Sequence, residues 1–443
     1  MNRREILAAA ATIGLVPAAR ALAATGDLRG AAREAYIFCL PLIEMAAARD
    51  RMLHAKPGDA GQPAAINAFR PTRNLAGPKN RTITTPNNDT LYSNAWLDFS
   101  KGPVTLTIPP SGERYVSVAL LNMYSDNDAI LGTRTTGNGG GTYTIVGPGE
   151  TGSGPNVVRC ATPHAWLLAR ILNDGPADLA AAHKVQDGFV LKGPAGIEPP
   201  PYATRKSPWR DYFTSAQQLL TADPPSASDG VALRRMAAMG LSPNTAFEPG
   251  KLDAAAVREI EAGLAEALPT ALRASAPNVV QGWTYPHGDI GYFGQDYAFR
   301  AAVALGGLAA LTPPEAMYLR PVGDSGQGSI LTGDYRLSFA AGKLPPVDAF
   351  WSITMYEATA DGQFFLTENA LNRYSIGDRT PGLRKNPDGS LDIWIGRSDP
   401  GGEKTANWLP APASGPFTIS LRAYLAKTDL LDGRWRAPAL VRL

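Results

Sequence analysis

The chain has 443 residues, of which 42 are lysine or arginine and 40 are aspartate or glutamate. A chain of this length can bury two hydrophobic cores. The charge is nearly balanced and no basic stripe alternates with aromatic residues, which excludes nucleic acid as an expected partner. Only two cysteines are present, Cys39 and Cys160, so a disulfide framework is excluded and at most one bridge can form. Cys39 lies in an apolar run, which favours a buried thiol.

The N-terminus has the pattern of an export signal. The pair Arg3-Arg4 precedes a stretch of small and apolar residues (8–19), and the small-x-small sequence Ala21-Leu22-Ala23 follows. This order predicts cleavage near residue 23, and the paired arginines favour the twin-arginine route. The apolar stretch is about half of the ~20 residues that a membrane-spanning helix needs, and no second long apolar segment follows. We therefore expect residues 1–23 to be a signal peptide and the remainder to be a soluble periplasmic or secreted protein.

The first part of the chain predicts one helix and then several short strands. Residues 28–55 place apolar side chains on one helical face, and Pro41 is expected to kink or break this helix. A stretch rich in proline and glycine follows. Five segments then have β character: 82–84, 91–99, 104–108, 115–120 and 143–146. Short strands bounded by glycine and proline at this spacing indicate an antiparallel sandwich or barrel.

Helical periodicity returns between residues 165 and 312, and the chain is β again from residue 318. The expected helices are 178–190, 209–220, 253–272 and 295–311, with Asp253 as a capping residue. The expected later strands are 335–339, 349–356, 391–395 and 417–424. The pattern predicts a mainly β (α+β) protein with helical insertions. Its expected parts are an N-terminal β module with a leading helix (28–165), a helical insertion and connection (166–317) and a C-terminal β-sandwich (318–443).

Two polar clusters follow or precede predicted strands in the N-terminal module. The first is Pro86–Tyr92 and the second is Asn122–Asp128. Asn and Asp side chains in such places often make turns that satisfy only their own backbone. Alternatively, oxygen-rich side chains at two strand ends of one sheet can meet at its rim and hold Ca²⁺ or Mg²⁺, with Asp89 and Asp126 as the candidate metal ligands, or bind a polyol. Arg134 follows closely and can pair with a carboxylate or phosphate.

Three segments of the C-terminal module mix aromatic and polar residues. Phe350–Tyr356 reads as a central strand, whose aromatic residues are expected in the core more than around a cofactor. The segments Asn372–Ser375 and Asn407–Pro410 read as loops that combine aromatic, amide and cationic groups. Such loops either line a site for a sugar or an aromatic ligand, or only tie the ends of the sandwich together.

These motifs carry a resemblance to two known families. Residues 86–98, together with Gly132–Gly137, resemble the bacterial domain of unknown function 1254. Residues 345–356, 372–378 and 407–410 resemble its usual companion, the domain of unknown function 1214. The resemblance covers roughly residues 30–440, and it implies two antiparallel jelly-roll-like β-sandwich modules joined by a helical segment, in proteins that are often exported. It implies no agreed activity or catalytic set.

Polar residues clustered at strand ends, which a sandwich does not need for folding, favour a hydrolase for a small polar or anionic substrate at the rim of the N-terminal module. Asp89 is then the general base or a metal ligand, and Tyr92 or Tyr124 donates a proton. The expected substrate-binding residues are Asn87, Asn88, Arg134, Trp351, Tyr356, Arg373 and Trp408.

Two other functions fit the same residues. One is a non-catalytic periplasmic protein that binds a carbohydrate or another small ligand, because β-sandwiches host both binding and catalysis. The other is a structural subunit that forms a stable homo-oligomer. The sequence leaves the reaction, the substrate and any Ca²⁺ or Mg²⁺ cofactor open.

Overall fold

The computed structural model describes residues 27–54, 64–81, 83–326 and 328–443. The expected signal peptide (1–23) lies outside these residues. The described chain has twenty strands in four sheets, together with a group of helices, so the predicted α+β fold with mostly β-sheets is confirmed. None of the helices in these ranges is long and apolar enough to cross a membrane.

The N-terminal β unit consists of two sheets packed face to face. The first sheet has the order β1 (Arg70–Pro71), β2 (Thr90–Asp98), β8 (His164–Leu172), β4 (Val116–Asn122), β5 (Asn127–Gly132). The second has the order β7 (Val157–Arg159), β6 (Gly141–Val146), β3 (Val104–Ile108), β9 (Val190–Lys192). Leu91 and Leu97 of β2 pack against Leu106 of β3 in the core between them. Successive residues of a strand point to opposite faces, so Tyr92 lies on the face of the first sheet that is turned away from this core.

Strand β8 corrects the sequence analysis. Residues 165–172 were expected to open the helical insertion, because leucine and alanine favour helix. They instead form the central strand of the first sheet, where β8 pairs with β2 on one side and with β4 on the other. A strand that has a neighbour on each side and is covered on both faces has a continuous run of apolar residues. Such a run has no alternating pattern, so the sequence does not distinguish it from a buried helix.

The C-terminal β unit also has two sheets. The larger has the order β10 (Asn278–Val280), β11 (Trp283–Tyr285), β12 (Ala316–Pro321), β19 (Phe417–Ala426), β14 (Val347–Ala358), β15 (Phe364–Phe365), and β16 (Ser375–Gly377) also pairs with β14. The smaller has the order β18 (Trp408–Pro410), β17 (Leu391–Gly396), β13 (Tyr335–Phe339), β20 (Leu440–Arg442). Ile353 of β14 and Leu421 of β19 lie in the core between the sheets with Leu337 of β13.

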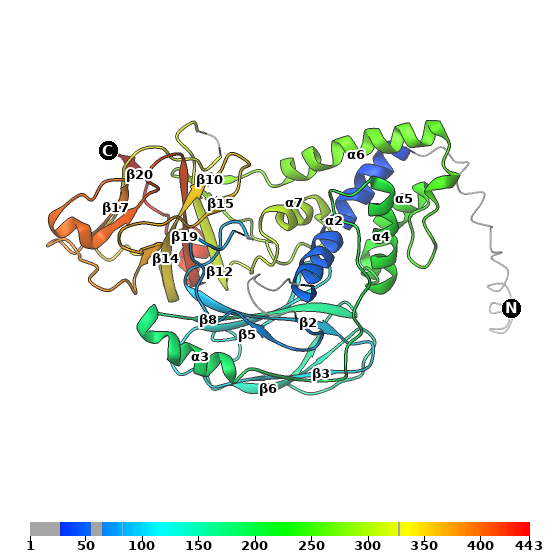
Figure 1. Cartoon of the computed structure of the whole chain (residues 1–443), viewed down its shortest axis with the longest axis horizontal. Coiled ribbons are helices and arrows are strands. Elements are labelled where there is room, and N and C mark those ends of the chain that lie inside the picture. Colours follow the sequence, from blue (N-terminus) through cyan, green and yellow to red (C-terminus); the bar gives the residue numbers. More distant parts are fainter. Residues whose placement is uncertain (1–26, 55–63, 82, 327) are drawn as a thin grey trace, which may run out of the picture.

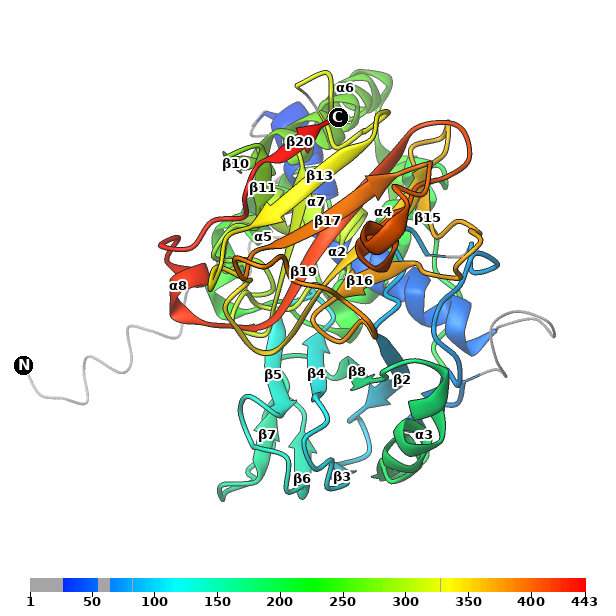
Figure 2. The same ribbon diagram turned by 90° about the vertical axis from the view of Figure 1, so that its left-hand side faces the viewer.

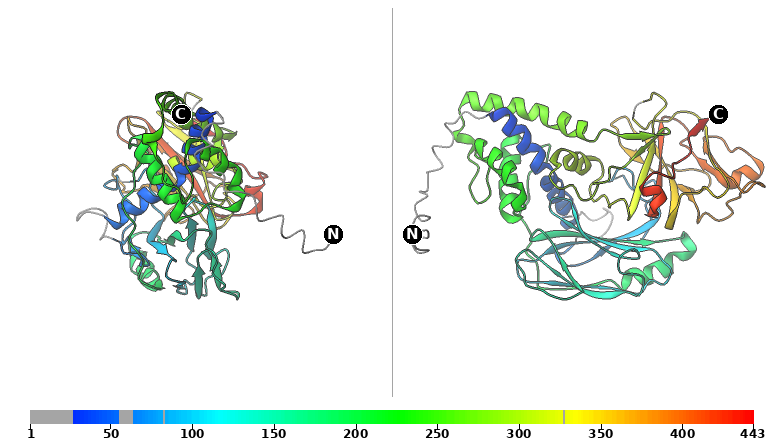
Figure 3. Two further views of the ribbon diagram at one scale, coloured as in Figure 1. Left: turned by 90° about the vertical axis from the view of Figure 1, so that its right-hand side faces the viewer. Right: turned by 180° about the vertical axis from the view of Figure 1, so that it is seen from behind.

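Most of the longer helices form a third body, which lies with the C-terminal unit above the N-terminal β unit (Figures 1 and 3). The exceptions are α3 (Leu179–Asp187), which lies beside the N-terminal β unit, and α8 (Thr428–Leu431), which packs in the C-terminal unit. The α-helices are α2 (Leu28–Leu53), α3 (Leu179–Asp187), α4 (Trp209–Ala222), α5 (Gly230–Met236), α6 (Ala254–Ala274), α7 (Tyr297–Gly306) and α8 (Thr428–Leu431). Short 3-10 helices are Pro176–Asp178, Ala227–Asp229, Ala237–Met239, Pro249–Lys251 and Gly402–Asn407. Helix α2 packs against α4, α5, α6 and α7, which explains its buried apolar surface.

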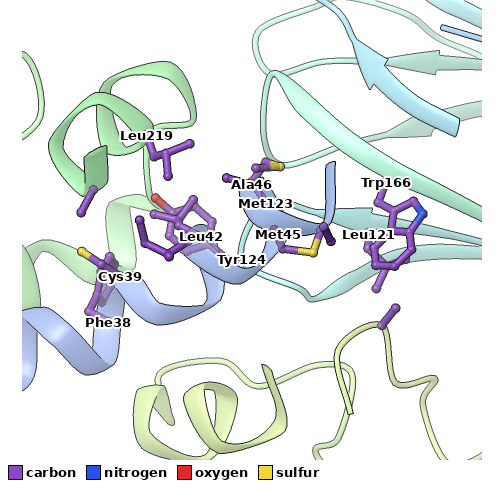
Figure 4. Packing of buried hydrophobic residues seen from close by; sticks show 14 of the residues in the cluster. Phe38, Cys39, Leu42, Met45, Ala46, Leu121, Met123, Tyr124, Trp166 and Leu219 are labelled. Carbon is purple, nitrogen blue, oxygen red and sulfur yellow. The ribbon is translucent and has the colours of Figure 1, made fainter. Parts of the chain in front are cut away.

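The structure tests the expectations for Pro41, for the Asp253 cap and for the two cysteines. Pro41 was expected to kink or break helix α2, and the helix runs through it without a break. Asp253 caps α6 as predicted, because its side chain accepts a hydrogen bond from the backbone N–H of Ala256. Cys39 and Cys160 are both free and buried, and burial raises the pKa of each thiol. Cys39 lies in the apolar packing between α2 and its neighbours (Figure 4).

The two β units meet through aromatic rings. The ring of Tyr115, next to β4, meets Phe350 and Tyr424 edge to face, with centroid separations of 5.7 and 5.4 Å. Phe350 and Tyr424 stack on each other at 4.2 Å. These residues belong to the same buried cluster as the inner face of α2. The larger C-terminal sheet therefore stands on the outer face of the first N-terminal sheet, as the side view also shows (Figure 2).

Candidate functional site

A pocket of about 370 Å³ lies where the two β units meet. The N-terminal unit contributes residues just before β2 and just after β8, and the C-terminal unit contributes β14 and both flanks of β16. The lining residues are Leu75, Asn88, Asp89, Asn173, Asp174, Gly175, Trp351, Ser352, Leu371, Asn372, Arg373, Tyr374, Ser375, Gly377, Arg379, Thr380 and Pro381. Most of them are polar, and both units are needed to form the pocket. We call it the interdomain pocket.

Asp89 is the most buried carboxylate of this pocket, with 4% of its surface exposed. Its Oδ2 accepts a hydrogen bond of 2.7 Å from the hydroxyl of Ser352 on β14. Its backbone N–H donates to Oδ1 of Asn87, an Asx turn that starts β2. Its backbone carbonyl accepts from the N–H of Asn173. The turn predicted for this motif is therefore present, and it holds the Asp89 carboxylate against the other β unit.

The guanidinium of Arg379 links the two units a second time. Its Nη2 lies 3.3 Å from Oδ1 of Asp89, and its Nη1 pairs with Asp174, which follows β8. The guanidinium stacks over the ring of Phe350, with 4.2 Å between Cζ and the ring centroid. Its Nε makes no hydrogen bond with any residue of the described ranges. This nitrogen lies 3.9 Å from Oδ1 of Asp378, which is beyond hydrogen-bond distance.

Asn173 offers a second donor from the wall of the pocket. Its side chain accepts a hydrogen bond from the N–H of Gly175 at 3.0 Å. Its Nδ2 has no hydrogen-bond partner among the residues that the structure covers, although only 3% of Asn173 is exposed. A buried N–H group without a partner costs free energy, so a bound molecule or water that accepts from it is stabilising.

The loop between β15 and β16 forms one side of the pocket and is held by its own polar groups. Oδ1 of Asn369 accepts from the N–H groups of Leu371 and Arg373, and Nδ2 of Asn369 donates to the carbonyl of Arg373. Asn372 has a φ of 49°, a left-handed conformation that Asn tolerates better than most residues. The guanidinium of Arg373 donates to three carbonyls around the start of β18: those of Thr405 and Ala406, and that of Trp408 at 2.8 Å.

A second carboxylate at this site has a shifted titration. Asp378 lies between two lining residues, Gly377 and Arg379, and its carboxylate is 3.3 Å from the N–H of Trp351. Loss of hydration raises the pKa of Asp378 to about 6, and the nearby Asp89 charge acts in the same direction against Arg379. Asp378 therefore exchanges its proton close to neutral pH.

The structure brings four of the predicted site residues to the interdomain pocket: Asn88, Asp89, Trp351 and Arg373. The ring of Trp351 packs against Phe339 in the C-terminal core, so its backbone is what faces Asp378. Other predicted residues lie just behind the pocket. Asn87 donates to the hydroxyl of Tyr424, and the hydroxyl of Tyr356 donates to the carbonyl of Pro86.

Of the seven predicted residues that do not line the pocket, three interact with other parts of the fold. Tyr124 lies in the apolar cluster beside α2 and α4, where its hydroxyl donates to the carbonyl of Asp223 (Figure 4). Arg134 pairs with Glu315, an internal carboxylate that also accepts from the hydroxyl of Tyr115. Asp126 pairs with Arg300 on α7.

The remaining predicted residues have structural contacts. Tyr92 lies on the outer face of the first sheet, beneath the guanidinium of Arg170. The indole N–H of Trp408 donates to the carbonyl of Gly396.

The two predicted metal ligands, Asp89 and Asp126, do not interact with the same residues. Asp89 and Asp126 interact with different arginines, Arg379 and Arg300. Across the described ranges, no group of three or more histidine, cysteine, aspartate or glutamate side chains is placed to hold a metal ion. A metal-ligand role for either aspartate stays a prediction.

Sequence reasoning missed Arg379, Ser352 and Asn173. Arg379 directly follows the 372–378 motif, whose last residue is Asp378, and a charged pair at the end of a recognised motif is a usable signal. Ser352 was read as one position of a core strand, and its polar neighbours at alternate positions, Thr354 and Tyr356, indicate a polar face. Asn173 follows β8, and it was missed because that strand was not predicted.

Two family models match the two parts of the chain that form the interdomain pocket. A family model described as a protein of unknown function (DUF1254) matches residues 66–193, and a second, described as a protein of unknown function (DUF1214), matches residues 315–428. No curated protein matches the chain. Every lining residue of the interdomain pocket falls within one of these two matched regions.

A solved structure shows the same fold. The crystal structure of the VPA0106 protein from Vibrio parahaemolyticus is similar with a TM-score of 0.68 and 24% identity, covering 94% of this chain and 100% of that chain. A putative uncharacterized protein from Burkholderia cenocepacia is similar with a TM-score of 0.43 and 14% identity, covering 89% of this chain and 85% of that chain. With both family models matched in the expected order, the chain belongs to the family that pairs an N-terminal DUF1254 domain with a C-terminal DUF1214 domain.

Proposed function

We propose that this protein binds a small polyhydroxylated molecule, of the size of a sugar, in the interdomain pocket. The observation that carries the proposal is the composition of the pocket wall. Asparagine, aspartate and arginine side chains from both domains surround about 370 Å³, within the range of roughly 300–1,000 Å³ that small-molecule sites occupy. Each of these planar groups has two atoms that can bond adjacent hydroxyls of a polyol.

The charges of the pocket favour a ligand with little net charge. Arg373 and Arg379 are matched by Asp89 and Asp174, and Arg379 already pairs with both carboxylates. A strongly charged ligand would have to disrupt these pairs. A polyol offers donors and acceptors at once, so it can accept from Nε of Arg379 and Nδ2 of Asn173 and donate to carboxylate oxygens without disturbing them.

The test is a thermal-shift screen of sugars, sugar alcohols, nucleosides and amino acids, followed by titration calorimetry of any hit. Asn173→Asp is the sharpest variant, because it keeps the oxygen that caps Gly175 and replaces only the unpaired Nδ2. We expect it to weaken binding about tenfold or more, which corresponds to about 1.4 kcal/mol or more. Asn156→Asp, which changes an exposed asparagine of the N-terminal unit, is the control and should bind normally.

Binding that is equal in Asn173→Asp and Asn156→Asp would place the ligand elsewhere. A panel in which only strongly anionic compounds bind would contradict the polyol class.

Hydrolysis is the second candidate, and the carboxylate pair Asp89–Asp378 favours it. The raised pKa of Asp378 suits a general acid, while Asp89 is held by Ser352 and Arg379 in the position of a base. Nitrophenyl glycosides and esters test this candidate directly. Turnover that disappears in both Asp378→Asn and Asp89→Asn, with binding retained, would select it over binding alone.

The predicted export signal extends the proposal to location. The arginine pair and the small-x-small sequence at Ala21-Leu22-Ala23 support a ligand that is met outside the cytoplasm. Fractionation of cells that express the whole chain, compared with an Arg3→Lys, Arg4→Lys variant, tests this. Equal periplasmic amounts of both would contradict the twin-arginine route.

A further inference from the structure

Two buried arginines lie at the centre of the contact between the two domains. Arg170 is on β8, the central strand of the first N-terminal sheet, and is 5% exposed. Arg422 is on β19, a central strand of the larger C-terminal sheet, and is 4% exposed. The strand register places Arg170 beside Tyr92 and Arg422 between Tyr318 and Ser352. Each domain therefore directs one guanidinium into their shared interior.

The guanidinium of Arg422 is largely satisfied by the protein. It donates to the hydroxyls of Thr354 and Tyr356 and to the carbonyls of Thr85 and Pro86. Only its Nε has no hydrogen-bond partner among the described residues. None of the four partners is a carboxylate. The Asp89 charge acts on Arg422 electrostatically, but Arg379 and Ser352 already hold that carboxylate.

The guanidinium of Arg170 is poorly satisfied. Its one hydrogen bond is to the carbonyl of Ala309, at 3.3 Å. Its Nε and Nη1 have no partner within the described ranges, and its Cζ lies 5.5 Å from the ring centroid of Tyr92. An arginine stays charged in a protein interior, so this burial costs several kcal/mol unless a counter-charge is present.

The carboxylates nearby are already engaged. Asp89 pairs with Arg379 and Ser352, and Glu315 pairs with Arg134 and Tyr115. A third cation, Arg320, lies in the same region, where burial lowers its pKa and the charge of Arg422 acts in the same direction. The interior between the domains therefore has a surplus of positive charge.

Tyrosine hydroxyls complete the surroundings. Tyr318 and Tyr424 lie near both Arg170 and Arg422, and burial raises the pKa of each phenol, so their hydroxyls stay protonated. Tyr92 and Tyr318 are only half-buried although they line this region, so water-sized molecules reach part of their surface. Phenol hydroxyls and guanidinium N–H groups are both donors to oxyanions.

We propose that the buried region around Arg170 and Arg422 is a second binding site, which holds one small oxyanion as a structural counter-ion between the two domains. The anion accepts hydrogen bonds from the unpaired N–H groups of Arg170 and from neighbouring tyrosine hydroxyls. It is separate from the interdomain pocket, because the Asp89–Ser352 pair lies between them: both residues line the pocket, and Ser352 is the cross-strand neighbour of Arg422. It goes beyond the proposed polyol function and does not depend on it.

The test compares melting temperatures of the whole chain in a buffer whose only anion is a bulky organic sulfonate. Phosphate, sulfate, acetate or chloride is then added at equal ionic strength. We expect an oxyanion to raise the melting temperature by at least about 2 °C, because it binds only the folded state. A response to acetate assigns a carboxylate, and a response to phosphate and sulfate assigns a tetrahedral oxyanion. No response beyond that of chloride would overturn the proposal.

Arg170→Met removes the charge and keeps a long side chain, and Arg336→Met is the matched control. Arg336 lies on β13 of the smaller C-terminal sheet, over the ring of Trp394. In the sulfonate buffer, Arg170→Met should melt at or above the wild-type temperature, and in saturating oxyanion the wild type should melt higher. Arg336→Met should keep the full anion response. Equal destabilisation of Arg170→Met in both buffers would make the arginine an ordinary packing residue and contradict the proposal.

A measurement on the wild type alone covers the case in which Arg170→Met does not fold. Protein purified in the sulfonate buffer after exposure to phosphate and acetate is denatured, and the released anions are counted by ion chromatography. About one oxyanion per chain supports the proposal, and none contradicts it. An Asn173→Asp variant that loses polyol binding but still releases the anion would show that the two sites are independent.

Discussion

The hydroxyl of Ser352 on β14 donates a 2.7 Å hydrogen bond to Oδ2 of Asp89 at the start of β2. The two residues are 263 positions apart in sequence, and neither exposes more than 4% of its surface. A hydrogen bond to a buried charged group is stronger than one between neutral groups. This contact therefore fixes the position of one domain on the other at the wall of the interdomain pocket.

Ser352→Ala should destabilise the protein by about 1–3 kcal/mol, because it leaves one oxygen of a buried carboxylate without its donor. Urea unfolding followed by fluorescence measures this. Ser390→Ala is the control, because it removes a half-buried hydroxyl that donates to the exposed Asp388 and accepts from Asn386, and it should destabilise the protein less than Ser352→Ala does. Similar changes in the free energy of unfolding for the two variants would mean that the Ser352–Asp89 hydrogen bond stabilises the protein no more than the Ser390–Asp388 hydrogen bond does.

Asp378→Asn should remove a pH dependence of stability. The pKa of Asp378 is raised to about 6, so the folded protein holds this proton to a higher pH than the unfolded chain does. Its contribution is most favourable below the pKa of the unfolded chain and is lost as the pH rises through about 6. The variant should therefore melt higher than the wild type at pH 8, on the order of 1–2 °C because solvent screens the charge, and equally at pH 4. A larger difference at pH 4 than at pH 8 would contradict the assignment.

Asn369→Ala should loosen the pocket loop with little effect on the cores. The variant loses the three local hydrogen bonds through which the Asn369 side chain holds Leu371 and Arg373, and each such bond contributes about 1 kcal/mol. Amide hydrogen exchange should become faster in residues 370–375 and stay unchanged in β14 and β19. Unchanged exchange throughout would show that the loop is held by its packing instead.

Tyr124→Phe separates a structural role from a catalytic one. The hydroxyl of Tyr124 donates to the carbonyl of Asp223 in the apolar cluster beside α2. Its loss should cost about 1 kcal/mol of stability and leave ligand binding and any turnover unchanged. A folded Tyr124→Phe protein of normal stability that no longer turns over a substrate would restore the catalytic role expected from sequence.

The strands that alternate between polar and apolar residues were the predictable part of the fold. The strands at 104–108 and 335–339 have the predicted bounds, and the cap at Asp253 is in place. The mainly β architecture and the two family resemblances are confirmed, while the jelly-roll topology stays a prediction. Strand β8 was missed because an apolar run without alternation does not distinguish a fully covered strand from a helix.

The site could be predicted only in part, for a reason that β19 makes clear. Thr418, Ser420 and Arg422 alternate with apolar residues, which predicts a strand with one polar face. The pattern does not say what covers that face, and the usual expectation is water. Here the other domain covers it, so Arg422 is buried and the pocket forms between domains. Asn88 and Asp89 could be predicted because the turn that they form depends only on neighbouring residues. Arg379 and Asn173 become site residues only because the two domains meet there, and the sequence pattern does not show that contact.

The segment Thr84–Pro86 crosses from the first domain onto the second. The N–H of Thr85 donates to the carbonyl of Phe364, and the carbonyls of Thr85 and Pro86 accept from Arg422. During synthesis, the partners of Thr85 follow it by 279 residues for Phe364 (364 − 85) and by 337 residues for Arg422 (422 − 85). We therefore expect the nascent first domain to stay incomplete at this edge until translation is nearly finished, and the two domains to mature together.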